Sequence, residues 1–289
     1  MPELPEVETI RRDLARKLKG RCIRSVTVGP AKVTTPRGAA FQRLVAGAVV
    51  RGVRRRGKLL LFDLALSRGV AAMMLVHLKM TGQLVLTHKQ KLIFGGHAIV
   101  GVSRVPNKYT HVTFHFTNAD TLYFNDLRRF GYVKLVKPEE AKRVESTYGV
   151  EPLARAFTLS AFELVLRRRS RTTIKAALLD QRGVAGIGNI YADEACFRAH
   201  VKPSRRVATL SAAEQRSLWQ AIKSVLVLSI KYRGTSFNTY VDAAGKTGGF
   251  WSHRFVYGRG GEQCRRCGTV LKRIVVVGRG TVYCANCQK

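Results

Sequence analysis

The sequence predicts an α+β protein in which an N-terminal helix and a mainly antiparallel sheet domain precede a helical domain and a C-terminal metal-binding hairpin. Three observations predict this order: apolar residues at helical spacing near the start, short alternating apolar runs through the middle, and two pairs of cysteines at the end. The 289 residues, 46% of them hydrophobic, are enough to bury one large core or two moderate ones.

The first predicted element is a helix that begins near Pro5 and stops at Gly20. Proline suits the first turn of a helix, and glycine suits the position just after its end. The apolar positions of this segment fall on one helical face, which is formed by Val7, Ile10, Leu14 and Leu18.

Residues 21–136 have the pattern of antiparallel strands, with apolar runs such as "KLLLFDL", "HVTFHF" and "TLYFN" separated by Gly, Pro and Asn. In the second run Phe114 and Phe116 are expected to face the core. The alternating residues His111, Thr113 and His115 are then expected to face outward, as in a one-sided strand.

Helical patterns replace the strands after Pro138. Capping boxes are predicted at Ser160 with Glu163 and at Ser211 with Glu214, and residues 234–261 are expected to form an ordered but mobile loop without regular structure. The predicted domains are a sheet domain (1–137), a helical domain (138–233), a loop region (234–256) and a hairpin that carries the cysteine pairs (257–289).

The charge predicts the class of partner. Lys and Arg number 51 against 18 Asp and Glu, which gives a formal net charge of +33 and favours a polyanion. Charge alone does not separate a DNA enzyme from a ribosomal or chromatin-like protein or from a membrane-surface binder. The apolar runs are too short for a membrane span, and the acidic N-terminus is unlike a secretory signal, so we expect a cytoplasmic location. We also expect the protein to be nucleoid-associated and monomeric.

The cysteines near the C-terminus have the spacing C-x2-C-x16-C-x2-C. Four thiolates in two matched pairs, separated by two short strands and a Gly-rich turn, suit one tetrahedral structural zinc ion. A redox dithiol or disulfides are the alternative interpretation, which a cytoplasmic location disfavours. The predicted ligands are Cys264, Cys267, Cys284 and Cys287.

Six segments together resemble the bacterial formamidopyrimidine-DNA glycosylase family, in the family's order and from end to end of the chain: "MPELPEVET", "HLKMTGQL", "FNDLRRFGY", "AGIGNIYADEA", "VYGRGGEQC" and the cysteine quartet. The resemblance implies an N-terminal β-sandwich, a helix-two-turn-helix domain and a zinc-finger β-hairpin. It also implies base excision repair of double-stranded DNA that contains oxidised purines or abasic sites.

The chemistry of the N-terminus supports this resemblance. A small residue at position 2 permits removal of Met1, and the secondary amine of Pro2 then becomes the terminus. An α-amine has a pKa near 8, which the positive end of the first helix lowers further. Such an amine can attack the sugar C1′ and hold the opened sugar as a Schiff base, with Glu3 as acid and base and Glu6 orienting the site.

The resemblance places the remaining site residues on DNA. Lys58 is grouped with the catalytic residues at a phosphate-binding position, and Met80, Arg128 and Phe130 fill the void left by an everted nucleotide. The donors of Arg128 suit an orphaned cytosine, which predicts activity on lesions opposite cytosine. The other predicted DNA contacts are Arg129, Asn189, Lys246 in the loop over the extruded base, and Arg279 at the hairpin turn.

Three alternatives stay open. The glycines before Asn189 permit a dinucleotide fingerprint, although the preceding segment looks helical. The endonuclease VIII-like sister family shares Pro2, Glu3 and the zinc hairpin but usually has glycine where this chain has Leu4. A catalytically silent DNA-binding protein would keep the charge and cysteines without needing the N-terminal motif.

The chain departs from the family pattern at three positions that flank functional segments. Leu127 stands where the family usually has proline, Lys79 replaces a glycine, and Val150 replaces a proline. Loss of the proline is expected to loosen the Arg128 loop, and Lys79 adds a charge beside Met80. These departures permit a shifted lesion preference.

Overall fold

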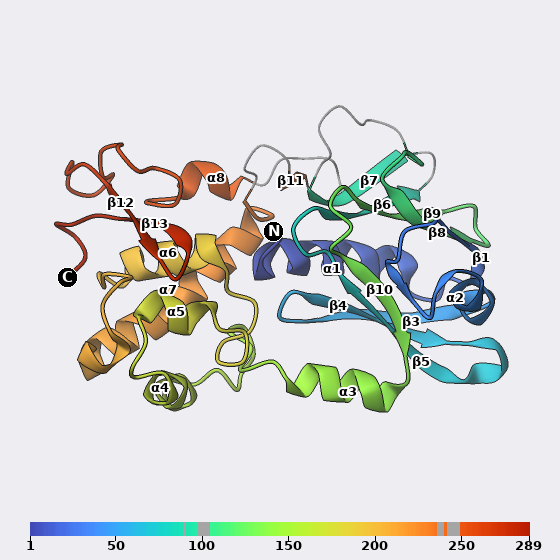
Figure 1. The fold of residues 1–289 in the computed structure, drawn as a ribbon, viewed down its shortest axis with the longest axis horizontal. Helices are drawn as coiled ribbons and strands as arrows, with labels where there is room; N and C mark the ends of the chain where they lie inside the picture. Colours follow the sequence, from blue (N-terminus) through green and yellow to red (C-terminus); the bar gives the residue numbers. More distant parts are fainter. Residues whose placement is uncertain (89–90, 98–104, 236–239, 242–248) are drawn as a thin grey trace. The chain divides into compact units, whose positions relative to one another are not determined.

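The structure, a computed structural model, describes residues 1–88, 91–97, 105–235, 240–241 and 249–289. It divides the chain into two compact units (Figure 1). The first unit contains Met1–Ser146 and Tyr232–Gly249, and the second contains Thr147–Lys231 and Phe250–Lys289. The division into four domains drawn from the sequence stays a prediction.

Two sheets form the first unit, and all of their described strand pairs are antiparallel except β10 with β2. The six-stranded sheet has the order β1 (Ile23–Val28), β8 (Thr110–Phe116), β9 (Thr121–Asp126), β6 (Gly82–His88), β7 (Lys91–His97) and β11 (Tyr240–Val241). The five-stranded sheet has the order β2 (Thr34–Thr35), β10 (Tyr132–Val136), β5 (Ala71–His77), β4 (Leu59–Ala65) and β3 (Val49–Arg56).

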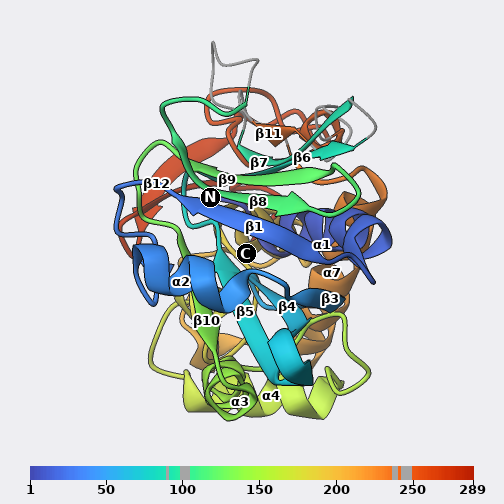
Figure 2. The same ribbon diagram turned by 90° about the vertical axis from the view of Figure 1, so that its right-hand side faces the viewer.

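One hydrophobic core joins the two sheets, which Figure 2 shows as layers with helices at their margin. Helix α1 (Leu4–Leu18) buries the predicted face of Val7, Ile10, Leu14 and Leu18 in this core, at 2% exposure or less. The helix ends before Gly20, whose φ of 80° lies in the left-handed region that glycine adopts readily. Helices α2 (Gly38–Val45) and α3 (Pro138–Ser146) complete the unit.

The predicted outward face of β8 is wrong at two positions. Phe114 and Phe116 are buried as expected, but His111 and Thr113 are also buried, at 4% and 8% exposure. The Nε2 atom of His111 lies 2.8 Å from the backbone oxygen of Asp126, so this face of the strand holds a buried polar contact. Alternation of apolar and polar residues does not reveal such a contact.

The second unit is mainly helical. Its helices are α4 (Leu159–Arg168), α5 (Ile174–Leu179), α6 (Asn189–Arg198), α7 (Ala212–Lys231) and α8 (Phe250–His253), and its hairpin is formed by β12 (Lys272–Val276) and β13 (Arg279–Tyr283). Short 3-10 turns lie at Ser67–Gly69 in the first unit and at Val207–Thr209 in the second. No helix in the described part of the chain is long and apolar enough to cross a membrane.

The helix boundaries confirm one predicted cap and correct another. Ser211 and Glu214 form reciprocal hydrogen bonds at the start of α7, with both N–H to oxygen distances at 3.2 Å or less. At α4, however, the hydroxyl of Thr158 accepts the hydrogen bond from the Ala161 N–H, so the helix begins before the predicted cap Ser160. The segment predicted as a loop without regular structure also contains β11 and α8.

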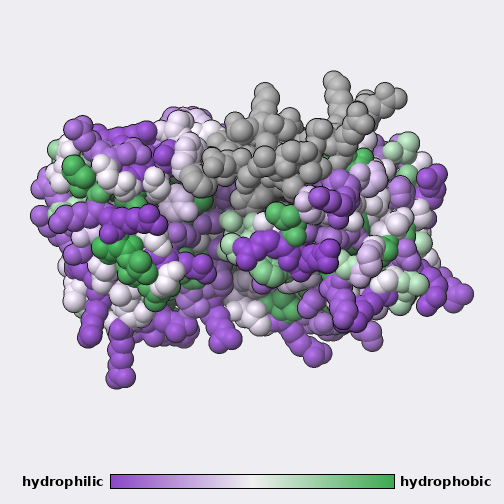
Figure 3. Space-filling model, turned by 45° about the horizontal axis from the view of Figure 1, so that its top comes forward, coloured by the Kyte–Doolittle hydropathy of each residue, from purple (hydrophilic) through white to green (hydrophobic). Residues whose placement is uncertain are grey.

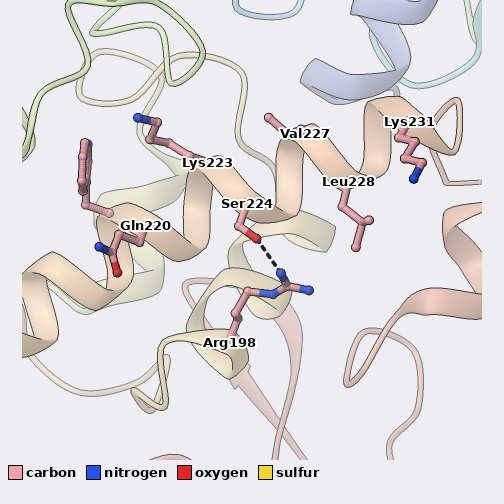
Figure 4. Close-up of a pocket in the computed structure, with 8 residues that line it drawn as sticks. Arg198, Gln220, Lys223, Ser224, Val227, Leu228 and Lys231 are labelled. Carbon is pink, nitrogen blue, oxygen red and sulfur yellow. Dashed lines mark hydrogen bonds between the residues drawn. The ribbon is translucent and has the colours of Figure 1, made fainter.

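Hydrophilic side chains cover much of the face shown in Figure 3, and the apolar residues between them form small patches. The second unit has a pocket of about 510 Å³ along α7 from Trp219 to Lys231, with Arg198 of α6 on its other side (Figure 4). Its lining includes Trp219, Lys223 and Val227. The lining residues do not include the site residues predicted from the sequence.

Candidate active site and nucleic-acid surface

The start of α1 forms a buried carboxylate cluster in the first unit. Pro2 is buried, and Glu3 and Glu6 are only 3% and 2% exposed. Glu6 accepts a backbone hydrogen bond at each carboxylate oxygen, from the N–H of Glu3 at 2.9 Å and from the N–H of Thr235 at 2.8 Å. Glu6 therefore fixes the N-terminus against a segment that is more than two hundred residues away in the sequence.

An amine at this end of α1 is poorly solvated. Burial lowers the pKa of the Met1 terminal amine below its ordinary value, while Glu3 and Glu6 oppose this effect and Lys58 adds to it. Lys58 is itself 5% exposed and follows the turn residue Gly57 between β3 and β4. The site thus holds an α-amine, two carboxylates and an ammonium close enough to influence one another, which suits proton transfer around a nucleophilic amine.

His77 belongs to the same region and was not predicted from the sequence. It pairs with Leu59, the residue after Lys58, and its Nδ1 accepts a hydrogen bond of 2.9 Å from the N–H of Lys79. Burial, helped by the charges of Lys79 and Lys58, lowers the pKa of His77 to about 3. A neutral ring bonded in this way carries its proton on Nε2. The only sign of His77 in the sequence was its position three residues before Met80, in the segment "HLKMTGQL".

The low pKa of His77 predicts a loss of stability in acid. The unfolded chain binds a proton near pH 6.5 and the folded chain only near pH 3, so the contribution of His77 to stability is complete above pH 6.5 and is lost as the pH falls toward 3. We expect a loss on the order of a few kcal/mol over this range. Urea unfolding of wild type and His77→Gln between pH 7 and 4 measures it. Identical pH dependence in the two proteins would contradict the assignment.

The predicted void-filling residues come together on two neighbouring loops. Met80 and Phe130 are 42% and 53% exposed, which is unusual for large apolar side chains. The Arg128 guanidinium lies 4.6 Å from the centre of the Phe130 ring, and its Nη1 lies 3.3 Å from the Met80 sulfur. Arg129 also lies on this exposed loop, with a left-handed φ of 57°. Met80, Arg128 and Phe130 thus form one exposed cluster.

Lys79 adopts a backbone conformation that explains the glycine usual at this position in the family. Its φ of 50° lies in the left-handed region, which costs a residue with a side chain about 1 kcal/mol. Its ammonium lies 6.0 Å from the centre of the Tyr132 ring. The charge that Lys79 adds beside Met80 is therefore placed over an aromatic face.

In the second unit, Asn189 is the first residue of α6, and its side-chain N–H donates to the backbone oxygen of Gly280 at 3.0 Å. This bond places the start of α6 beside Arg279, the first residue of β13. The exposed Arg279 follows the tight turn at Val277 and Gly278, which both have positive φ. Backbone N–H groups at a helix start and a guanidinium on the adjacent hairpin suit phosphate binding.

A buried ion pair connects the hairpin of β12 and β13 to the helices beside it. The ammonium of Lys175 lies 2.6 Å from Asp193 Oδ1, and both side chains are fully buried. Lys175 also donates to the hydroxyl of Thr281 at 2.7 Å, and the Val282 N–H donates to Asp193 at 3.2 Å. The hairpin is therefore attached to α5 and α6 by charged hydrogen bonds.

The four predicted zinc ligands meet at the base of the hairpin, with all four sulfur atoms within 4.8 Å of one another. Three of the Sγ to Sγ distances lie between 3.4 and 4.0 Å, close to the roughly 3.8 Å expected for sulfurs 2.3 Å from a tetrahedral zinc ion. Cys264 and Cys284 also belong to a small hydrophobic cluster that includes Phe197 and Val282. The quartet is the protein's site for one structural zinc ion.

Lys246 lies outside the residues that the structure describes. Its predicted place over an extruded base stays a prediction.

A strongly basic chain with buried carboxylates at the start of α1, a zinc hairpin beside the start of α6 and an exposed Met-Arg-Phe cluster has the features of a protein that acts on nucleic acid. Three family models match the chain: the formamidopyrimidine-DNA glycosylase N-terminal domain over residues 1–133, its H2TH domain over residues 148–241, and a zinc finger found in FPG and IleRS over residues 261–289.

Full-length relatives agree with these models. Formamidopyrimidine-DNA glycosylase of Listeria monocytogenes is 40% identical over 293 aligned positions that cover all of both chains. The Lactococcus lactis Fpg in complex with abasic-site DNA has a TM-score of 0.85 at 32% identity and 99% coverage of each chain. A variant of the same protein with Fapy-dG DNA gives 0.85 at 33% and 100% coverage. The chain belongs to the formamidopyrimidine-DNA glycosylase family and is a DNA glycosylase of DNA repair.

Proposed function

We propose that this glycosylase excises oxidised purines, 8-oxoguanine and formamidopyrimidines, opposite cytosine and then cuts the strand by β,δ-elimination. The observation that carries the proposal is the buried start of α1, where Pro2 lies beside two buried carboxylates and an amine has a lowered pKa. The Fapy-dG and abasic-site complexes of the Lactococcus lactis relative support the same class of DNA.

In the proposed reaction, removal of Met1 makes the Pro2 nitrogen the terminal secondary amine. Its lone pair attacks C1′ of the damaged nucleotide while the bond from C1′ to the base breaks and the base leaves with a proton. Glu3 moves the proton that opens the sugar ring, which gives a Schiff base between Pro2 and C1′. Loss of a proton at C2′ then expels the 3′ phosphate, and a second elimination expels the 5′ phosphate.

Recognition of the lesion is assigned to the exposed cluster and the phosphate-binding residues. Met80, Arg128 and Phe130 fill the space left by the everted nucleotide, and the donors of Arg128 match the acceptors of the orphaned cytosine. Lys58, Asn189 and Arg279 hold the phosphates, and Arg129 adds charge beside them. We place this activity on cytoplasmic DNA, carried out by a monomer.

Borohydride trapping tests the proposal directly. Duplexes with 8-oxoguanine opposite cytosine or with thymine glycol are incubated with wild type and with Pro2→Leu. The larger residue keeps Met1 in place and moves the amine by one position. Pro5→Ala, at the next proline along the chain and in the first turn of α1, is the matched control. We expect a covalent adduct on 8-oxoguanine in wild type and Pro5→Ala and its loss in Pro2→Leu.

The other outcomes are informative. An adduct that persists in Pro2→Leu would assign the nucleophile to another amine. Preferential trapping on thymine glycol would favour oxidised pyrimidines, and the Lactococcus lactis Fpg has also been solved in complex with DNA that contains an oxidised pyrimidine. Tight DNA binding without any adduct would favour the silent DNA-binding alternative.

A further inference from the structure

We propose that Asp126 is a positioning residue that fixes two loops relative to each other: the loop that carries Met80 and Thr81, and the loop from Leu127 to Gly131 that carries Arg128 and Phe130. The cluster of Met80, Arg128 and Phe130 can then distinguish the base opposite a lesion. The inference rests on the proposed function for its role on DNA, but the structural part stands on contacts within the first unit. Asp126 is the last residue of β9 and is fully buried.

The carboxylate of Asp126 accepts hydrogen bonds from both loops. Its Oδ1 accepts from the Thr81 hydroxyl, next to Met80, and from the backbone N–H of Arg128 at 3.2 Å. Its Oδ2 accepts from the backbone N–H of Gly131 at 2.7 Å. One carboxylate therefore bonds residues at both ends of the segment that carries Arg128 and Phe130, and also the loop that carries Met80.

The surrounding backbone leaves the carboxylate little freedom. Asp126 pairs directly with Gly82 across β9 and β6, and its backbone oxygen contacts the buried ring of His111. A Cβ atom at Gly131 would lie 3.0 Å from Asp126 Oδ2 and 2.9 Å from the backbone oxygen of His77. This close approach explains the glycine after Phe130 and brings its N–H within reach of the carboxylate.

Leu127 lies between Asp126 and Arg128, at one of the positions where the chain departs from the family pattern. The family usually has proline here, whose ring would restrict the backbone directly. In this chain, which has Leu127 there, the N–H of Arg128 donates to the Asp126 carboxylate and, at 3.1 Å, to the Thr81 hydroxyl. Hydrogen bonds therefore restrain the Arg128 loop, and the loosening expected from loss of the proline stays a prediction.

Asp126→Asn tests the role with little change in shape. The amide has one acceptor oxygen in place of two, so whichever way it turns, its NH2 group faces the N–H of either Arg128 or Gly131. Asp120→Asn is the matched control. Asp120 precedes β9, is also buried at 4% exposure, and bonds His88 and Asn118, away from both loops.

The first readout is amide hydrogen exchange in the zinc-loaded protein without DNA. In Asp126→Asn we expect exchange at Arg128 or Gly131 to rise about tenfold, the change expected from loss of one hydrogen bond to a charged group. In Asp120→Asn these two amides should keep their wild-type rates. Wild-type rates in Asp126→Asn would overturn the proposal.

The second readout is the ratio of single-turnover base release opposite cytosine to that opposite adenine. This ratio does not depend on the fraction of folded enzyme, so a merely structural loss does not change it. We expect a fall of about tenfold in Asp126→Asn and no change in Asp120→Asn. An unchanged ratio in Asp126→Asn, or an equal fall in both variants, would overturn the role in discrimination.

The two readouts separate this proposal from the proposed function. If wild type excised equally opposite either base, the assignment of opposite-base recognition to Arg128 would fail. Faster exchange in Asp126→Asn alone would then still establish that Asp126 positions the loops.

Discussion

Replacing Glu3 by Gln is expected to slow base release from 8-oxoguanine by about 10² to 10⁴, the usual contribution of a positioned acid and base. Glutamine has nearly the same shape, and Glu3 is buried at the start of α1, so the change removes proton transfer without removing basic surface. Affinity for a duplex with a stable abasic-site analogue should stay within a few fold of wild type. Single-turnover kinetics and binding titrations measure the two quantities.

Glu8→Gln is the control for this prediction. Glu8 lies in α1, is 8% exposed and bonds Arg11, Arg12 and Arg55. Burial alone would raise the pKa of its carboxyl, but these arginines outweigh that effect and hold the pKa below its ordinary value. We expect Glu8→Gln to reduce stability but to leave base release near the wild-type rate. Wild-type turnover by Glu3→Gln, or an equal loss in both variants, would reject the catalytic role of Glu3.

The second large effect is expected from the zinc site. Cys284→Ser removes a buried ligand that also packs in the small cluster with Phe197, so the hairpin should lose its zinc and its fixed geometry. Because Arg279 is presented by this hairpin, affinity for abasic-analogue DNA should fall roughly tenfold to a hundredfold. Metal analysis of the purified protein and a binding titration measure these losses.

Cys22→Ser is the matched control, because Cys22 is a half-buried thiol whose Sγ lies 3.7 Å from the backbone oxygen of Gly47, in the other unit. It should retain one zinc ion per chain and wild-type affinity. If Cys284→Ser kept both, the cysteine quartet would not be the zinc site that holds the hairpin.

The sequence was most informative where local spacing decides the structure. The apolar period of α1, the capping box of α7 and the spacing of the cysteine pairs each depend on residues that are near one another in the chain. These features are present in the structure at the expected residues.

Contacts between distant residues could not be read in this way. Three such features depend on how strands and segments meet in space: the hydrogen bond from Thr235 to Glu6, the three hydrogen bonds to the Asp126 carboxylate, and the burial of His77. The capping error at α4 has a more local cause: Thr158 and Ser160 are both good cap residues, and the sequence pattern favoured the wrong one.

In its proposed role of filling the space left by an everted nucleotide, the cluster of Met80, Arg128 and Phe130 affects how the enzyme would search DNA. Its members already touch one another in the protein without DNA, through the contacts of Arg128 with the Met80 sulfur and the Phe130 ring. Because these side chains are already in contact, a protein sliding along DNA would lose little side-chain conformational entropy when it inserts them at a base pair. We therefore expect the time that such an enzyme spends at each base pair to depend mainly on how easily the nucleotide there leaves the stack.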